Sequence, residues 1–137
     1  MSGLEVNTAL LCDDVRREDN GKLILIGVYT GGIVFSGPFP AALSNLFVFL
    51  SANTSLEDVD VEFRLFQNTG ARELRLVRGN FKRDAKAPTS ALGRIDLPIP
   101  LGPIAFDEAG DYVFQMRDPG GIWQPVLEFS VSSNASP

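Results

Sequence analysis

The stretch "FDEAGDYVFQM", residues 106–116, decides the fold class of this chain. Beyond Gly110 its large side chains fall on every second residue, at Tyr112, Phe114 and Met116, and therefore share one face of an extended backbone. A glycine directly before such a run is typical of a turn that leads into a strand. We predict a β-strand here, with one face buried in a core.

The spacing Glu108-x-Gly110-x-Tyr112-x-Phe114 resembles the tyrosine corner of Greek-key sandwiches, and Phe114 stands where immunoglobulin domains have a cysteine. The resemblance covers only this strand and its turn, and it implies a fold rather than a function. A plain strand entered through a glycine turn would have almost the same structure, and this simpler interpretation stays open.

Short apolar segments bounded by Gly, Pro, Asn or Asp recur along the whole chain, as in all-β proteins. No window shows an apolar stripe of period 3.6 over the length of a helix. A parallel sheet would need crossover helices, so we predict an antiparallel, Greek-key-like sandwich of about eight strands, similar in architecture to immunoglobulin or C2 domains. We expect one domain over residues 1–132 and a flexible tail over 133–137. The expected strands lie near residues 5–13, 22–29, 45–52, 59–67, 73–79, 93–99, 111–117 and 126–132.

Residues 59–79 alternate on both sides of a central turn and predict a hairpin. Opposite charges favour the register that sets Glu62 against Arg75 and Arg64 against Glu73, unless a bulge intervenes. Further along, Pro98 and Pro100 occupy one side of an apolar segment, where they cannot donate ladder hydrogen bonds; this segment is expected to be an edge strand or an extended strap.

Composition excludes several kinds of chemistry. The chain has 137 residues, 45% of them hydrophobic and 21% charged, as in an ordinary soluble domain. It contains no histidine, which excludes Ser–His–Asp and Cys–His catalysis and zinc sites that need imidazole. The single cysteine, Cys12, can form neither an intrachain disulfide nor a thiolate metal site. We therefore expect no cofactor and no catalytic or metal site, and lean away from an enzyme.

The absence of a long apolar run or a secretion signal favours a cytoplasmic protein with no membrane partner. The net charge of −5 argues weakly against nucleic acid as the main partner. Basic residues nevertheless gather in one segment: Arg72, Arg75, Arg78, Lys82, Arg83 and Lys86. Phe81 lies among them, as a base-stacking residue would in a single-strand binder, so nucleic-acid binding stays an alternative beside simple solvation of these charges.

Two groups of acidic residues are candidate cation ligands. Asp13, Asp14 and Glu18 flank Asn20-Gly21, but this dipeptide is the strongest short hairpin signal, and we interpret the group as the charged end of a hairpin. The second group consists of residues in loops or at strand ends, which a C2-like sandwich could use to bind Ca²⁺ or a small ligand. Its members are Asp58, Asp60, Asp107, Glu108, Asp111 and Asp118.

Two strands carry apolar side chains on both faces, whereas a strand of a two-layer sandwich buries only one. Either the Pro-marked segments 36–44 and 97–106 fold over the second face, or another protein chain does. We predict that this surface includes Leu23, Leu25, Phe47 and Phe49, with Trp123 as a further candidate recognition residue. A protein partner or self-association is the expected function, and the loop carboxylates are the alternative.

The segments "ALLCDDVRRE", "GKLILIGVYTGGI" and "PFPAALSNLFVFL" resemble a family of small bacterial proteins catalogued as a domain of unknown function. The resemblance lies in Cys-Asp, Val-Arg-x-Glu, Gly-Lys and Ile-Gly-Val-Tyr, here at residues 12–13, 15–18, 21–22 and 26–29. It implies a bacterial β-sandwich without an assigned activity, so it transfers no functional residue to this chain.

Overall fold

The computed structural model describes residues 4–55, 58–82 and 93–135. Every regular element within these ranges is a strand. This part of the chain contains no helix that is long and apolar enough to cross a membrane. The strands are β1 (Glu5–Arg17), β2 (Leu23–Val28), β3 (Ile33–Phe35), β4 (Ala41–Leu43), β5 (Phe47–Asn53), β6 (Asp58–Gln67), β7 (Arg72–Lys82), β8 (Arg94–Pro100), β9 (Ile104–Phe106), β10 (Gly110–Arg117) and β11 (Gln124–Ser133). Each of the eight expected strands is present.

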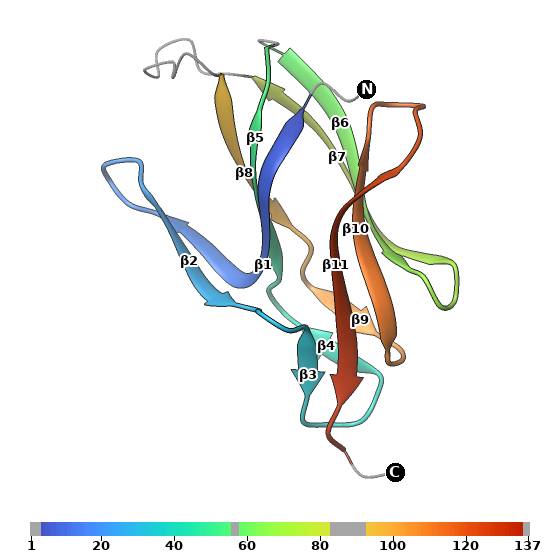
Figure 1. Cartoon of the computed structure of the whole chain (residues 1–137). Coiled ribbons are helices and arrows are strands. Elements are labelled where there is room, and N and C mark those ends of the chain that lie inside the picture. The colour runs from blue at the N-terminus through green and yellow to red at the C-terminus, as the bar shows by residue number, and fades with distance from the viewer. Residues whose placement is uncertain (1–3, 56–57, 83–92, 136–137) are drawn as a thin grey trace.

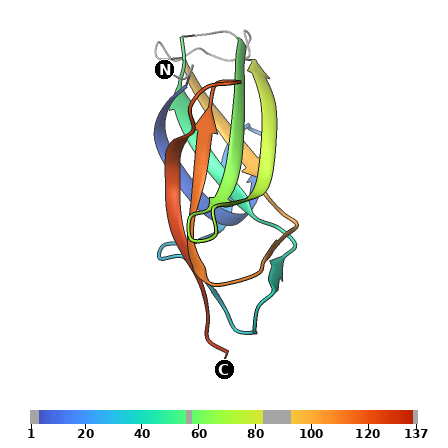
Figure 2. The same ribbon diagram turned by 90° about the vertical axis from the view of Figure 1, so that its right-hand side faces the viewer.

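Two sheets form a sandwich, as predicted. One has the strand order β2-β1-β5-β8 and the other the order β3-β11-β10-β6-β7. The two layers are seen edge-on in Figure 1, and in Figure 2 the second sheet lies in front of the first. All described pairs are antiparallel except β3 with β11, which run parallel.

The core lies between the two sheets and follows the alternation of the strands. Val48, Leu50 and Ala52 of β5 are fully buried, while Phe47 and Phe49 between them are not. Within the second sheet, Phe63 of β6 and Phe114 of the neighbouring strand β10 stack with their ring centroids 5.4 Å apart. Burial of these large apolar side chains supplies most of the stabilisation of the sandwich.

The tyrosine corner is present. Tyr112 is fully buried, and its hydroxyl donates a hydrogen bond of 2.8 Å to the backbone carbonyl of Glu108, four residues earlier. Its ring packs edge-on against Phe106 at 5.1 Å and stacks on Phe129 at 6.0 Å. Burial, followed by the charge of Glu108, raises the pKa of Tyr112, so its hydroxyl keeps the proton that it donates.

The predicted register of the β6–β7 hairpin is wrong. Glu62 lies opposite Arg78 rather than Arg75, and Phe63 lies opposite Val77. A register shift between Leu65 and Phe66 changes the pairing further along. The observed register places Val77 and Phe81 on the core side, and Phe81 contacts Phe63 at 6.3 Å. Apolar burial therefore decides the register, because it contributes more than exposed ion pairs do.

The Pro-marked segments 36–44 and 97–106 do not fold over the outer face of a sheet, which was one of the two expected arrangements. Residues 41–43 and 104–106 pair as β4 and β9, a short ribbon below the sheets in Figures 1 and 2. Ile104 and Phe106 are buried there, so the ribbon closes one end of the core. Residues 97–100 belong to β8, which is an edge strand of the first sheet, as its prolines predict.

Order continues past residue 132, the expected end of the domain. Ser133 still belongs to β11, and its hydroxyl donates a hydrogen bond of 2.6 Å to the carbonyl of Gly37. The backbone N–H of Asn134 bonds the carbonyl of Phe35 at 2.8 Å. These bonds tie the end of β11 to the segment around β3.

Replacing Tyr112 by Phe keeps the ring but removes the hydroxyl, which leaves the Glu108 carbonyl without this partner. We expect the free energy of unfolding to fall by about 0.5–1.5 kcal/mol, the usual net contribution of one hydrogen bond. Denaturant unfolding followed by circular dichroism measures the change. The Tyr112→Leu variant, which also loses the ring contacts, should lose more; equal stability of Tyr112→Phe and wild type would contradict the corner.

Candidate functional site

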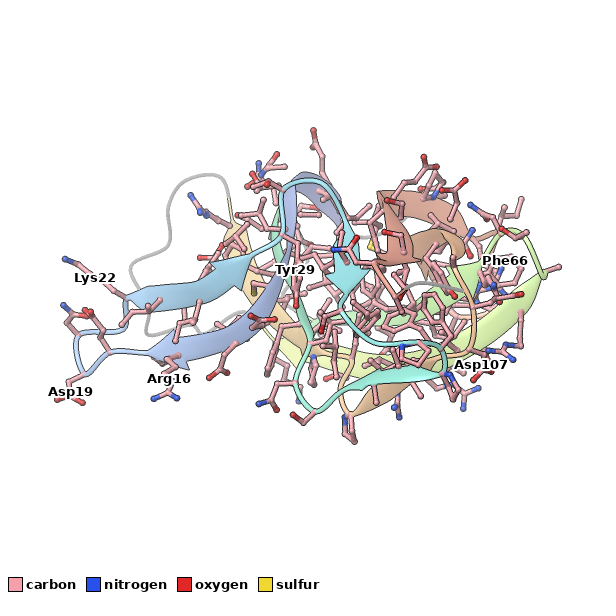
Figure 3. The ribbon with its side chains drawn as sticks, turned by 90° about the horizontal axis from the view of Figure 1, so that it is seen from below. Arg16, Asp19, Lys22, Tyr29, Phe66 and Asp107 are labelled. Carbon is pink, nitrogen blue, oxygen red and sulfur yellow. The ribbon has the colours of Figure 1, made fainter. Side chains whose placement is uncertain are left out.

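A two-stranded hairpin projects from the sandwich, on the left of Figure 1. We call residues 13–28 the arm. Cys12 pairs with Phe47 of β5 on one side and with Val28 of β2 on the other. Beyond Cys12, β1 leaves β5 and pairs with β2 alone within the described chain. In Figure 3 Arg16, Asp19 and Lys22 lie far from the body, and Tyr29 lies where the arm joins it.

The turn at the tip of the arm confirms the hairpin interpretation of the charged residues near Asn20-Gly21. The backbone N–H of Glu18 donates to the carbonyl of Lys22 at 2.8 Å, and Gly21 donates to the carbonyl of Glu18 at 2.9 Å. Gly21 has a φ of 86°, a conformation that glycine adopts without strain. The Asn20 side chain accepts a bond of 3.0 Å from the backbone N–H of Lys22.

The arm exposes one row of aliphatic side chains. Ile24, Ile26 and Val28 are 42%, 41% and 41% exposed, although large apolar residues are usually buried. Because residues opposite each other in a ladder share a face, this row lies on the same face as Cys12 and Phe47. We call Ile24, Ile26 and Val28 the arm row.

The predicted interaction residues divide between two faces. Phe47 and Phe49 share the face of the arm row and are partly buried. Leu23 and Leu25 are also partly buried, but they alternate with Ile24 and lie on the other face of the arm. The four residues of the predicted interaction surface therefore lie on two faces, and Ile24, Ile26 and Val28 rather than the two leucines share the face of Phe47 and Phe49.

The base of the arm is held by Asp13, Gly27 and Tyr29. Gly27 has a φ of 68°, and the Asp13 carboxylate occupies the space where a side chain at Gly27 would lie. The Tyr29 hydroxyl donates a hydrogen bond to the same carboxylate. The Tyr29 ring packs against the core, and its N–H bonds the carbonyl of Leu11 at 2.8 Å.

Two titratable groups at this junction remain neutral at physiological pH. Burial, followed by the hydrogen bond to Asp13, raises the pKa of Tyr29 to about 12. Burial, followed by the negative charge of Asp13, raises the pKa of the Cys12 thiol, which is fully buried. A buried neutral thiol is unreactive, so Cys12 acts as a small core residue.

Trp123 lies on the outer face of the other sheet, in contact with two arginines. The guanidinium carbons of Arg64 and Arg117 lie 4.4 Å and 4.2 Å from the centroid of its ring. Its neighbour Ile122 is 86% exposed. Trp123 is therefore partly buried by cation–π contacts, and Ile122 is the large apolar residue that this loop exposes.

Arg117 also belongs to a charged cluster around Glu62. The Glu62 carboxylate accepts bonds from Arg78 at 3.3 Å and from Arg117 at 3.4 Å. Burial would raise the pKa of Glu62, but the bonds and charges of the two arginines outweigh burial and lower it. A hollow of about 460 Å³ beside the cluster is also lined by Asp60 and Asn80, which bond each other at 2.8 Å.

The described members of the basic segment do not gather into one free patch. Arg72 pairs with Asp107 at 2.7 Å, Arg78 pairs with Glu62, and Arg75 donates to the backbone carbonyl of Pro103. Lys82 ends β7, and Arg83 and Lys86 lie outside the described residues.

Four of the loop acids, Asp58, Asp60, Asp107 and Glu108, are likewise engaged within the protein. Asp58 and Asp60 both accept bonds from the Asn80 amide, and Glu108 accepts a bond of 2.7 Å from Gln67. In the ranges that the structure describes, no three acidic or cysteine side chains converge as metal ligands would.

Sequence reasoning located the arm but missed the arm row. It found apolar side chains on both faces of residues 23–28, and it chose Leu23 and Leu25 as the outer pair. The signal that could have corrected this choice is the turn: pairing of Glu18 with Lys22 sets Val15 opposite Leu25 and Cys12 opposite Val28. To place Phe47 on the same face as Cys12, one must also know the register of β1 with β5, and no local motif reveals this register.

Two comparisons with known proteins complete the description. No curated protein matches the chain. A family model matches residues 7–120, which is more than half of the chain and contains the whole arm. The expected membership in a family without an assigned activity is thereby confirmed. The chain belongs to this family of unknown function, DUF6941.

Proposed function

We propose that this protein is a non-catalytic assembly module that binds a protein partner through the arm row. The observation that carries the proposal is a two-stranded arm outside the sandwich whose three aliphatic side chains are about two fifths exposed. As an expectation from the sequence alone, the module acts in the bacterial cytoplasm.

Physical chemistry supports a partner at this place. A two-stranded hairpin without further support is only marginally stable in water. Covering the exposed part of Ile24, Ile26 and Val28 would contribute about 1 kcal/mol per side chain. A partner on this row would therefore stabilise the arm while it gains binding energy itself.

The junction of the arm supports the same proposal, because it restricts the direction of the arm before binding. The bond from Tyr29 to Asp13 and the contact of Asp13 with Gly27 tie the arm to residues that pack on the core. A preorganised surface loses less conformational entropy on binding than a mobile one.

The alternative sites have less support. The described basic residues Arg72, Arg75 and Arg78 are bonded within the protein, as are the acids Asp58 and Glu108. Ligand binding through loop carboxylates or nucleic-acid binding through the basic segment would compete with these bonds. The arm row needs no such rearrangement.

Site-specific photocrosslinking in living cells tests the proposal. A photoreactive amino acid at Ile26 should crosslink to another protein chain, whether a second copy or a different protein. Ile122 is the matched control: it is 86% exposed against 41% for Ile26, so exposure alone would favour crosslinks there. Adding Ile24→Asp should abolish the crosslinks from Ile26. Crosslinks from Ile122 with none from Ile26 would overturn the proposal.

The restrained junction has a measurable pH dependence. The pKa of Tyr29 rises from 10 to about 12 on folding. The free energy of unfolding therefore contains a contribution from the protonated Tyr29 hydroxyl, which is fully present below pH 10 and is lost as pH rises through about 12. Tyr29→Phe should lack this contribution, so the difference between the two proteins should shrink over that range. Urea unfolding at several pH values measures it.

An absorbance titration provides the second check on the junction. The chain has two tyrosines, so near-ultraviolet absorbance reports both phenols directly. In the wild type, ionisation should begin only well above pH 10, and Tyr29→Phe should lack one of the two late transitions. Ionisation of Tyr29 at its ordinary pKa would contradict the restrained junction.

A further inference from the structure

The arm row is flanked on β1 by one acid and one base. Asp14 lies opposite Ile26, and Arg16 lies opposite Ile24, so both charged residues share the face of the row. They form an exposed ion pair of 3.1 Å with each other, and the Arg16 side chain is 69% exposed. The face therefore has its apolar residues on β2 and two opposite charges beside them on β1.

This pattern is complementary to itself. The pair Val15 and Leu25 lies midway between the two charged positions and midway between the two isoleucines. Consider a two-fold axis that passes through this midpoint, lies in the plane of contact and is perpendicular to the strands. Rotation about this axis brings two such faces together, with the strands of the two copies antiparallel. Ile24 then meets the partner's Ile26, and Arg16 meets the partner's Asp14.

We propose that the partner bound by the arm row is a second copy of this chain, joined across this two-fold axis. The proposal rests on the proposed function and deepens it by naming the partner. Complementary charge is the reason: both ion pairs and both isoleucine contacts form at once under one axis, as in an isologous interface.

The same arrangement explains why Phe47 and Phe49 remain partly exposed. A stable interface covers roughly 800 Å² on each partner, which is more than three aliphatic side chains provide. Antiparallel arms direct the tip of each arm toward the base of the other. There Phe47 and Phe49 of β5 share the face of Val28, with the fully buried Cys12 between Val28 and Phe47, so the partner's tip approaches these two partly exposed rings.

Charge reversal tests the second copy as the partner. Asp14→Arg and Arg16→Asp, made separately, each set like charges against each other across the axis, and each should weaken the dimer at least about tenfold. The double variant Asp14→Arg/Arg16→Asp should restore the dimer, because its two charges are again opposite. Sedimentation equilibrium over a range of protein concentrations measures the dissociation constant.

Mixing the two single variants gives the most specific test of the dimer. The two single variants are complementary to each other at both charged positions, so an equimolar mixture should form a heterodimer more readily than either variant alone forms a homodimer. Arg17→Asp is the matched control: Arg17 lies opposite Leu23, on the other face of the arm, and its reversal should leave the dimer unchanged.

The outcomes separate this proposal from the one on which it rests. A wild-type monomer at all concentrations, or single variants that dimerise as the wild type does, would overturn the second copy. If crosslinks from Ile26 then identify a different protein, the assembly function stands and only the partner is wrong. If those crosslinks are also absent, both proposals fail.

Discussion

The structure depends on one backbone position, Cys12, where β1 pairs with two strands at once. Up to this residue β1 is a strand of the sandwich, beside β5, and after it β1 is one half of the arm, beside β2. A single continuous strand therefore carries both the core and the projection. For this reason the faces of the arm are continuations of the faces of the sheet, and the arm row is in line with Phe47 and Phe49.

Sequence reasoning predicted the parts of the fold that local chemistry determines. Three local features each indicate a structure without reference to distant segments. They are the alternation of Tyr112, Phe114 and Met116, the turn at Asn20-Gly21 and the prolines of β8. The sandwich followed from such signals, whereas the family followed from the resemblance of residues 12–29 to known sequences. The surplus of apolar faces in residues 23–28 and 47–50 also indicated where to look for a contact surface.

The predictions that failed concern pairings between distant segments. In the β6–β7 hairpin, charge alone favoured Glu62 opposite Arg75. The observed register instead packs Val77 and Phe81 against the core, and this places Glu62 opposite Arg78. Arg117, from a third strand, then completes the cluster. In the arm, the outer face depends on how Cys12 connects two ladders and on the positive φ of Gly27. Neither the bulge in β6–β7 nor that connection has a signature within its own segment.

The parallel pairing of β3 with β11 has a consequence for the order of folding. It joins residues 33–35 to residues 131–133, so one edge of the sandwich cannot close until residue 133 has been synthesised, about a hundred residues after β3. Sheets with such distant contacts fold slowly, in about milliseconds to seconds, whereas a hairpin closed by a tight turn forms within about 1–10 microseconds. On a ribosome the arm is thus among the first elements that can form, long before the edge made by β3 and β11 can close.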